Sequence, residues 1–379
     1  MDQPQYTDVL AGVQMVPDPR KARGKRLEWS FVWGVITSAL LCNQRTPAAI
    51  AQWAREQATL LLAAFRPAHG RVPSESSIRR TLRHVDIAAL EQHLAQVAPP
   101  GAPASNAPSS PPLQGQAVDG KYLRGVGAHG TPLELVSLVE HASGRVRAQV
   151  AVGTHELESR AVPRLLAGRD LSGVVVTLDA GLACPTLAQQ ILQQGGQYLM
   201  VIKRNHGQLY EDLTWFFASP PLPCEQPWQE ATTLTKGHGR LETRHLTCTA
   251  DLDDYLTWPG VQQVLRRECE RLELKTGKVS TAVTYGVTSV APAAATPLEL
   301  EGWWRGHWTI ENRVHYVRDV TMGEDGHQMH TGQAPQALAA LRNTVLMLLR
   351  RAGWTNIAAA LRHFANVPTE ALQFIGART

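Results

Sequence analysis

Cysteine is scarce in this chain of 379 residues, and its five cysteines are widely scattered. They stand at Cys42, Cys184, Cys224, Cys248 and Cys269, so no two of them have the CxxC spacing. The sequence therefore indicates neither a disulfide framework nor a structural zinc site. A chain without paired cysteines fits a reducing compartment, and we expect a cytoplasmic location.

Long hydrophobic runs and a strong excess of charge are also missing. The apolar run from Trp29 to Cys42 is too short to cross a bilayer and predicts a buried helix. The first residues lack the basic and then apolar order of a signal peptide, so we expect no membrane partner. Lys and Arg number 37 against 33 Asp and Glu, a balance that permits nucleic-acid binding without requiring it.

Helix signals dominate residues 1–97. The segment Trp29–Leu41 predicts an apolar helix, and Thr46–Phe65 predicts a second helix that begins with an N-cap and a proline. Pro73–Arg83 predicts another capped helix with arginines in its first turns. A solvated charged face is the commoner interpretation of such a run, and contact with DNA is the alternative. The arginines in question are Arg79, Arg80 and Arg83.

Proline, alanine and serine are concentrated in residues 98–112, a composition that cannot bury a core and predicts a linker. This segment marks the clearest domain boundary. The predicted parts are a helical, DNA-binding domain (1–97), the linker (98–112), an α/β catalytic domain (113–352) with a β-rich insertion (218–300), and a C-terminal tail (353–379).

After the linker the pattern changes to strands, in the predicted order β-β-β-α-β-α-β-α. Asp119 lies at the end of the first strand, and Asp179 follows the apolar run that predicts the fourth. This order is that of the ribonuclease H-like fold, and open α/β sheets bind ligands at the carboxyl ends of their strands. A role in a turn is the competing interpretation, above all for Asp119 with Gly120 behind it.

Residues 304–320 contain no proline and predict a helix. Residues three and four apart share one face of a helix. Glu311 would then lie among aromatic and imidazole side chains, partly desolvated, and would require a cation or a metal ion. The spacing of His307, Glu311 and His315 also permits a zinc site. The predicted stripe consists of Trp304, His307, Trp308, Glu311, His315 and Arg318.

Taken in this order, these landmarks resemble the DDE transposases of bacterial insertion sequences, in the ISAs-type branch that includes the H repeat-associated proteins. The resemblance covers roughly residues 10–352. Ala117–Lys121 is similar to the first catalytic motif of the family, Thr177–Ala180 to the second, and His307–Asn312 to the third. Two further matches have no settled role: Lys203–Asn205 and Gly237–Glu242.

The resemblance implies a ribonuclease H-like enzyme that cleaves DNA at element ends and transfers the 3′-OH into target DNA. Asp119, Asp179 and Glu311 would be catalytic and would hold two Mg²⁺ (or Mn²⁺) ions, hard cations that prefer oxygen ligands. The implied partners are element ends and target DNA, bound by a homodimer or higher oligomer. Residues expected to contact DNA are Lys121, Arg79, Arg80, Arg83, Lys203, His307 and Arg318.

Two other functions remain open at this point. A ribonuclease H-like nuclease would use the same carboxylates but would cut DNA without joining strands. A domesticated DNA-binding protein would keep the basic helices and would not need the metal site. Strand-transfer products distinguish the first alternative from a transposase, and failure to bind Mg²⁺ would indicate the second.

Overall fold

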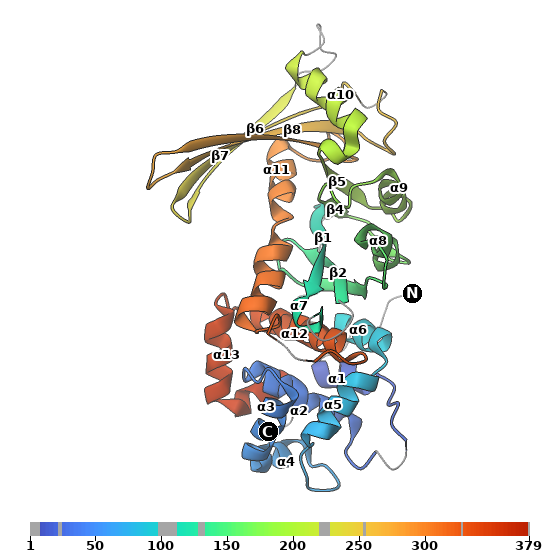
Figure 1. Cartoon of the computed structure of the whole chain (residues 1–379), viewed down its shortest axis with the longest axis vertical. Helices are drawn as coiled ribbons and strands as arrows, with labels where there is room; N and C mark the ends of the chain where they lie inside the picture. Colours follow the sequence, from blue (N-terminus) through green and yellow to red (C-terminus); the bar gives the residue numbers. More distant parts are fainter. Residues whose placement is uncertain are drawn as a thin grey trace.

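The structure, a computed structural model, is an elongated molecule with helices at one end and an arm of long strands at the other (Figure 1). The predicted linker lies outside the described residues except for Pro112. No helix of the described part is long and apolar enough to cross a membrane. The structure describes residues 8–21, 25–97, 112–127, 133–219, 228–252, 255–326 and 329–377.

One nine-stranded sheet runs through the molecule. Its first five strands are β1 (Gln114–Leu123), β2 (Leu133–Glu140), β3 (Val146–Ala151), β4 (Val174–Leu178) and β5 (Gln197–Ile202). In space they follow the order β3-β2-β1-β4-β5, with β1, β4 and β5 parallel and β2 antiparallel to its two neighbours. The predicted succession of strands and helices is confirmed here. The intervening helices are α7 (Arg124–Gly127), α8 (Glu158–Leu166), α9 (Pro185–Gln193) and α10 (Gly207–Ala218).

Strand β4 is apolar throughout because both faces of the sheet are covered at this point. Successive side chains of a strand point to opposite faces. Val176 therefore packs into the cluster that α8 and α9 build, whereas Val175 packs with Leu300 and Trp304 of α11 (Pro297–Gly306). Figure 1 shows α8 and α9 on one side of these strands and α11 on the other.

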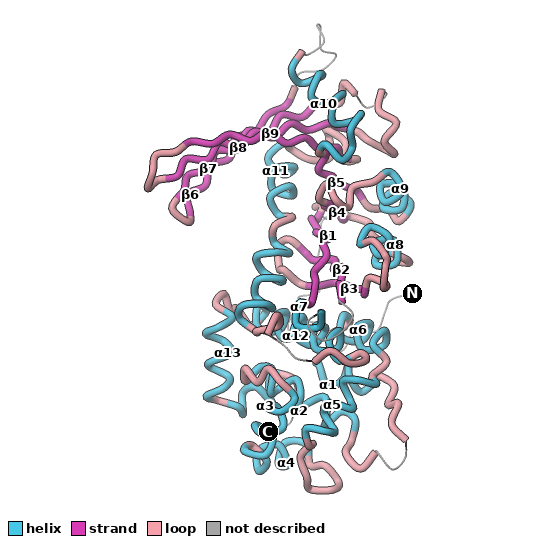
Figure 2. The backbone as a smooth tube through the Cα atoms, in the orientation of Figure 1, coloured by secondary structure: helices cyan, strands magenta, loops and turns pink. Residues whose placement is uncertain are grey.

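The predicted β-rich insertion continues this sheet. Its strands are β6 (Gln229–Gly237), β7 (Arg240–Thr249), β8 (Gln263–Glu273) and β9 (Val279–Thr288). All are antiparallel to their neighbours, and β9 pairs with β5, so the sheet extends outward as the arm in Figure 2.

The Gly237–Glu242 motif forms the tight turn between β6 and β7. His238 and Gly239 have φ angles of 50° and 73°, the positive values that a two-residue hairpin turn requires. Glu242 follows the turn and accepts from Arg271 Nε of β8 at 2.9 Å. We therefore interpret this motif as a structural element that forms the β6–β7 turn and connects β7 to β8 at the tip of the arm.

Within residues 8–21 and 25–97, the described part before the sheet, the helices are α1 (Val9–Gln14), α2 (Trp29–Leu41), α3 (Pro47–Glu56), α4 (Ala58–Phe65), α5 (Glu75–His84) and α6 (Ile87–Ala95). The helix predicted at Trp29–Leu41 is confirmed. The single helix predicted from Thr46 to Phe65 is wrong, because Gln57 leaves helical geometry with φ −97° and ψ 19°. The break turns α4 so that Phe65 packs against Phe31 of α2, with ring centroids 5.2 Å apart.

Helices from both ends of the chain share one hydrophobic cluster. The predicted C-terminal tail contains α13 (Ile357–Asn366) and α14 (Pro368–Phe374), which follow α12 (Ala334–Arg351) and pack with it against the N-terminal helices. We predicted α12 as an amphipathic helix on the sheet. It is instead buried on all sides, because α2, α5 and α6 cover it as well as β3. The domain boundaries stay a prediction, but residues 1–97 do not complete their core alone.

Glu91 of α6 joins the N-terminal helices to the rest of the molecule. Its Oε1 accepts from Gln149 Nε2 of β3 at 2.6 Å and from Gln336 Nε2 of α12 at 2.9 Å. Burial raises the pKa of Glu91 from 4.5 to about 7, although these two hydrogen bonds and Arg318 oppose the rise. Ionising this carboxyl therefore costs more in the folded chain than in the unfolded chain.

Glu91→Gln is expected to remove a pH-dependent loss of stability. Because the folded-state pKa is raised, the wild-type free energy of unfolding should fall as pH rises from about 4.5 to about 7. Glutamine keeps the acceptor oxygen but not the charge, so the variant should gain on the order of 2–3 kcal/mol at pH 8. Urea unfolding at several pH values measures this. Glu270→Gln on the surface of β8 is the control, and parallel wild-type and Glu91→Gln curves would contradict the prediction.

Candidate metal centre

Asp119 and Asp179 lie on neighbouring parallel strands. Val118 of β1 pairs with Leu178 of β4. Asp119 and Asp179 are the next residues along the chain after this pair, so they lie side by side just beyond it. We predicted that Asp119 ends its strand, but β1 continues to Leu123, paired with β2 throughout. A turn role for Asp119 is therefore wrong. Asp179 does follow its strand, and its Oδ1 accepts from the Leu182 N–H at 3.0 Å.

The third carboxylate comes from the helical segment that continues α11. This segment contains two stretches of π-helix, η3 (Ile310–His315) and η4 (Val317–Thr321). In η3 the Tyr316 N–H donates to the Glu311 carbonyl, five residues back. Such π-helical turns are rare and frequently occur at functional sites.

The predicted stripe of this segment is only partly present. Trp304, His315 and Arg318 are buried, as expected for one face. Trp308 is 60% exposed, and the Glu311 side chain is 52% exposed. Glu311 is thus half-buried beside the His315 imidazole, as the expected partial desolvation requires, but the exposed Trp308 does not enclose it.

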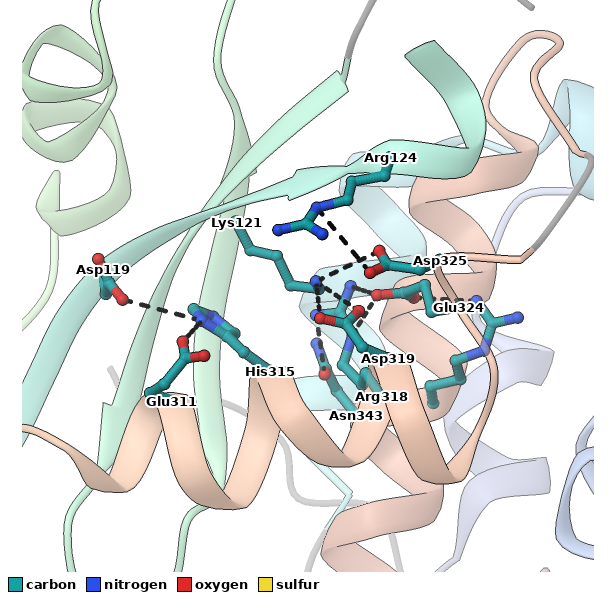
Figure 3. Close-up of polar contacts among 11 residues, drawn as sticks. Asp119, Lys121, Arg124, Glu311, His315, Arg318, Asp319, Glu324, Asp325 and Asn343 are labelled. Carbon is teal, nitrogen blue, oxygen red and sulfur yellow. Dashed lines mark hydrogen bonds and ion pairs between the residues drawn. The ribbon is translucent and has the colours of Figure 1, made fainter. Parts of the chain in front are cut away.

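Three side chains converge between β1 and η3 (Figure 3). His315 Nδ1 lies 3.1 Å from Glu311 Oε2 and 3.8 Å from Asp119 Oδ2. The ligand atoms of Asp119, Glu311 and His315 all lie within 4.8 Å of one another, a spacing that could hold a metal ion. Asp179 is not a member of this group. His315 was predicted on the same helix face as Glu311 and in the alternative zinc set, but not among the catalytic residues.

The electrostatics of this group favour a bound cation. Burial raises the pKa of Asp119 to about 6, and the carboxylates of Asp179 and Glu311 add to the rise, while His315 opposes it. Asp179 therefore lies close enough to act on Asp119. The hydrogen bond from His315 lowers the pKa of Glu311, which keeps that carboxylate ionised. Carboxylates that repel one another are stabilised by an opposite charge placed among them.

Glu158, at the start of α8, is a further acidic residue that we did not predict. Burial raises its pKa to about 7, helped by the charges of Asp119, Glu134 and Asp179. It approaches β1 at Gly120, where a Cβ atom would lie 2.1 Å from Glu158 Oε1. The glycine after Asp119 thus serves close approach rather than a turn. Glu158 carried no signal in the sequence beyond its place at a helix start.

His307 faces the sheet. Its Nδ1 lies 3.1 Å from Thr177 Oγ1 of β4, and His141 Nε2 lies 3.0 Å from the same hydroxyl. Burial lowers the pKa of His307 and lowers that of His141 to about 3, so both rings are neutral at neutral pH. Since Thr177 is two residues before Asp179, these rings support the strand that carries this aspartate. The zinc set considered for His307, Glu311 and His315 is not assembled.

Lys121 and Arg318, both expected to contact DNA, are buried in ion pairs. Lys121 Nζ lies 2.5 Å from Asp319 Oδ1. Arg318 is 0% exposed, and its Nε donates to Glu324 at 2.8 Å, while Arg342 binds the other oxygen of Glu324 at 2.9 Å (Figure 3). The predicted phosphate contacts of Lys121 and Arg318 are therefore wrong, because Lys121 pairs with Asp319 and Arg318 pairs with Glu324 inside the molecule.

Of the other predicted DNA contacts, His307 faces the sheet through Thr177, whereas the arginines of α5 and Lys203 lie on the surface. Arg79, Arg80 and Arg83 are exposed on α5. Lys203 is exposed just after β5, the neighbour of β4, so it lies at the same edge of the sheet as Asp179. Asn205 Nδ2 donates to the Ala180 carbonyl at 2.6 Å. This hydrogen bond connects the segment after β5 to the segment after β4.

Several known proteins are similar to this chain. The DDE_Tnp_1-associated family matches residues 10–98. The "Uncharacterized protein in dhlA 3'region" of Xanthobacter autotrophicus is 29% identical over 73% of this chain and 92% of its own length. "Putative transposase YncI" of Escherichia coli O157:H7 is 29% identical over 62% of this chain and 61% of its own. "H repeat-associated putative transposase YhhI" of Escherichia coli K12 is 27% identical over 62% of this chain and 63% of its own length.

The match thus spans less than two thirds of these two Escherichia coli proteins. Among solved structures, the piggyBac transposase synaptic complex with hairpin DNA overlaps 96% of this chain and 78% of that chain, at 8% identity and a TM-score of 0.48.

The fold and the site define a mixed α/β protein in which carboxylates gather beside neighbouring strands of a large sheet. The matched N-terminal segment and the relatives named as putative transposases support the resemblance of this chain to the DDE transposases of the H repeat-associated branch.

Proposed function

We propose that this protein cleaves DNA at the ends of its element and transfers the freed 3′-OH into target DNA, in a ribonuclease H-like catalytic core. The observation that carries this proposal is the convergence of Glu311 on Asp119, with Asp179 on the adjacent parallel strand. The strand order β3-β2-β1-β4-β5, with β2 reversed, supports the ribonuclease H-like assignment.

Asp119, Asp179 and Glu311 would hold the divalent ions. Their oxygen donors are the ligands that Mg²⁺ and Mn²⁺ prefer, and a cation among them would offset the repulsion that Asp179 and Glu311 exert on the Asp119 carboxylate. When bound, such ions lower the pKa of water and stabilise charge on the attacking and leaving oxygens.

The other residues would position these groups. The His315 ring orients the Glu311 carboxylate, and the Thr177 contacts of His307 and His141 support β4. Lys203, at the sheet edge that carries Asp179, would contact a phosphate of the DNA. Element ends and target DNA would be the partners, and a homodimer or higher oligomer in the cytoplasm would be the working form.

A cleavage and strand-transfer assay tests the proposed function. The substrate is a DNA duplex carrying the inverted repeats that flank the gene, incubated with the full chain and Mg²⁺ or Mn²⁺. A transposase should produce a free 3′-OH at the element end and then a product joined to target DNA. Cleavage without joined product would indicate a nuclease. Binding without cleavage in either metal would indicate a DNA-binding protein that no longer catalyses.

The exposed arginines of α5 are expected to bind DNA phosphates. Replacing Arg79, Arg80 and Arg83 with glutamine should weaken end binding and reduce the slope of log K against log salt by about 1 for each phosphate that the protein no longer binds. The variants belong in the full chain, because residues 1–97 share their core with α12 to α14. A gel-shift series across ionic strength measures the slope. Arg305→Gln is the control, and an unchanged slope in the triple variant would assign end binding to another surface, such as the β6–β9 arm.

A further inference from the structure

We propose that His315 is a metal ligand, so that Asp119, Glu311 and His315 form a mixed oxygen and nitrogen site that prefers Mn²⁺ to Mg²⁺. This inference rests on the proposed function, because it concerns the ion that Asp119 and Glu311 would share. It goes further because it adds a third protein ligand for that ion. The added ligand gives the site a preference between metals that carboxylates alone would not produce.

The geometry around His315 fits a shared ion. Adjacent ligands of an octahedral ion at 2.0–2.1 Å are about 3 Å apart. The His315 Nδ1 to Glu311 Oε2 distance of 3.1 Å matches this spacing. Asp119 Oδ2 is somewhat wider at 3.8 Å, and the Asp119 side chain is 32% exposed, which leaves room for a small rotation.

The surroundings of the imidazole point to the same role. The His315 side chain is only 3% exposed, and Figure 3 shows its ring beside the carboxylates of Asp119 and Glu311, with contacts to both. Both contacts are made by the same ring nitrogen, Nδ1, so the three side chains together make a compact set of ligands for one cation.

A nitrogen ligand changes which metal the site selects. Mg²⁺ is a hard ion that prefers oxygen ligands and gives up its water reluctantly. Imidazole binds divalent transition-metal ions, and Mn²⁺, although it binds most weakly in that series and also accepts oxygen ligands, tolerates a nitrogen ligand better than the harder Mg²⁺. If His315 only oriented Glu311 by a hydrogen bond, the bound ion would have oxygen ligands alone. Metal coordination therefore distinguishes the two roles without any measurement of DNA cleavage.

Pulsed EPR of Mn²⁺ bound to the full chain tests this directly. The wild-type protein should show a ¹⁴N coupling to Mn²⁺, which should change to a ¹⁵N coupling when the histidines are labelled with ¹⁵N. His315→Gln should remove the coupling and weaken Mn²⁺ binding about 10-fold or more. Mg²⁺ affinity, measured by competition, should change less, so the preference for Mn²⁺ should fall. His245→Gln on the exposed face of β7 should change none of these.

The outcomes separate this inference from the proposed function. Bound Mn²⁺ without nitrogen coupling in wild-type protein would overturn the role of His315 and leave the carboxylate centre in place. No Mn²⁺ binding at all would overturn both. Thermal unfolding without metal shows whether His315→Gln folds. If it does not, the exchange of ¹⁴N for ¹⁵N coupling in wild-type protein still decides whether a histidine binds the metal, and its absence would reject the proposal.

Discussion

Asp119→Asn, Asp179→Asn and Glu311→Gln are each expected to reduce end cleavage about 1,000-fold or more, while end binding changes little. Each substitution keeps the shape of the side chain but removes a negative charge that would hold a divalent ion. Bound metal stabilises the transition state by several kcal/mol, and each 1.4 kcal/mol corresponds to about tenfold in rate. Cleavage in Mg²⁺ and Mn²⁺, alongside gel shifts of the same DNA, measures the effect.

The controls for these three variants come from the structure. Chelation of the metal should reproduce the loss in wild-type protein, and Glu211→Gln on α10 should cleave normally. Asp319 and Asp325 pair with Lys121, and Glu324 pairs with two arginines, so these acidic residues are already engaged. Near wild-type cleavage by Asp119→Asn, Asp179→Asn or Glu311→Gln would remove that residue from the proposed site.

Arg318→Ala is expected to destabilise the fold by about 3–5 kcal/mol, the usual effect of removing one partner from a buried ion pair. Arg318 is fully buried and donates to Glu324 and to Asn343 of α12. Without it, the buried carboxylate of Glu324 keeps only Arg342. The pKa of Glu324 is lowered because Arg318 and Arg342 together outweigh the effect of its burial. Urea unfolding measures the loss.

Arg305→Ala is the matched control, because Arg305 is exposed on α11 in the same helical segment. It should change the free energy of unfolding by no more than about 0.5 kcal/mol. Normal stability in Arg318→Ala combined with weaker DNA binding would contradict the buried ion pair and restore a phosphate contact for Arg318.

Local pattern was enough to predict the central strands and helices. The apolar run before Asp179 predicted a buried strand, and the succession of strands and helices predicted a ribonuclease H-like sheet. The strand positions of Asp119 and Asp179 then indicated a common site, although β1 continues past Asp119 to Leu123. These properties depend on residues close together in the chain, so they can be read before any tertiary contact is known.

Side-chain burial between distant segments could not be predicted in the same way. Lys121 and Asp319 form an ion pair although they are 198 residues apart in the sequence. The sequence around Arg318 gave no sign that this side chain is buried and donates to Asn343 of α12. The segment predicted as one helix at 304–320 contains two π-helical stretches, and it exposes Trp308 while His315 lies beside the carboxylates of Asp119 and Glu311.

The sequence by itself thus determined the order of the central elements and the two aspartates at neighbouring strands, because periodicity and strand position are local. Only the tertiary structure decided which charged groups face solvent and which pair internally. That choice depends on how much each group is desolvated and on which opposite charge lies within a few ångströms, and both follow from packing between parts of the chain far apart in sequence.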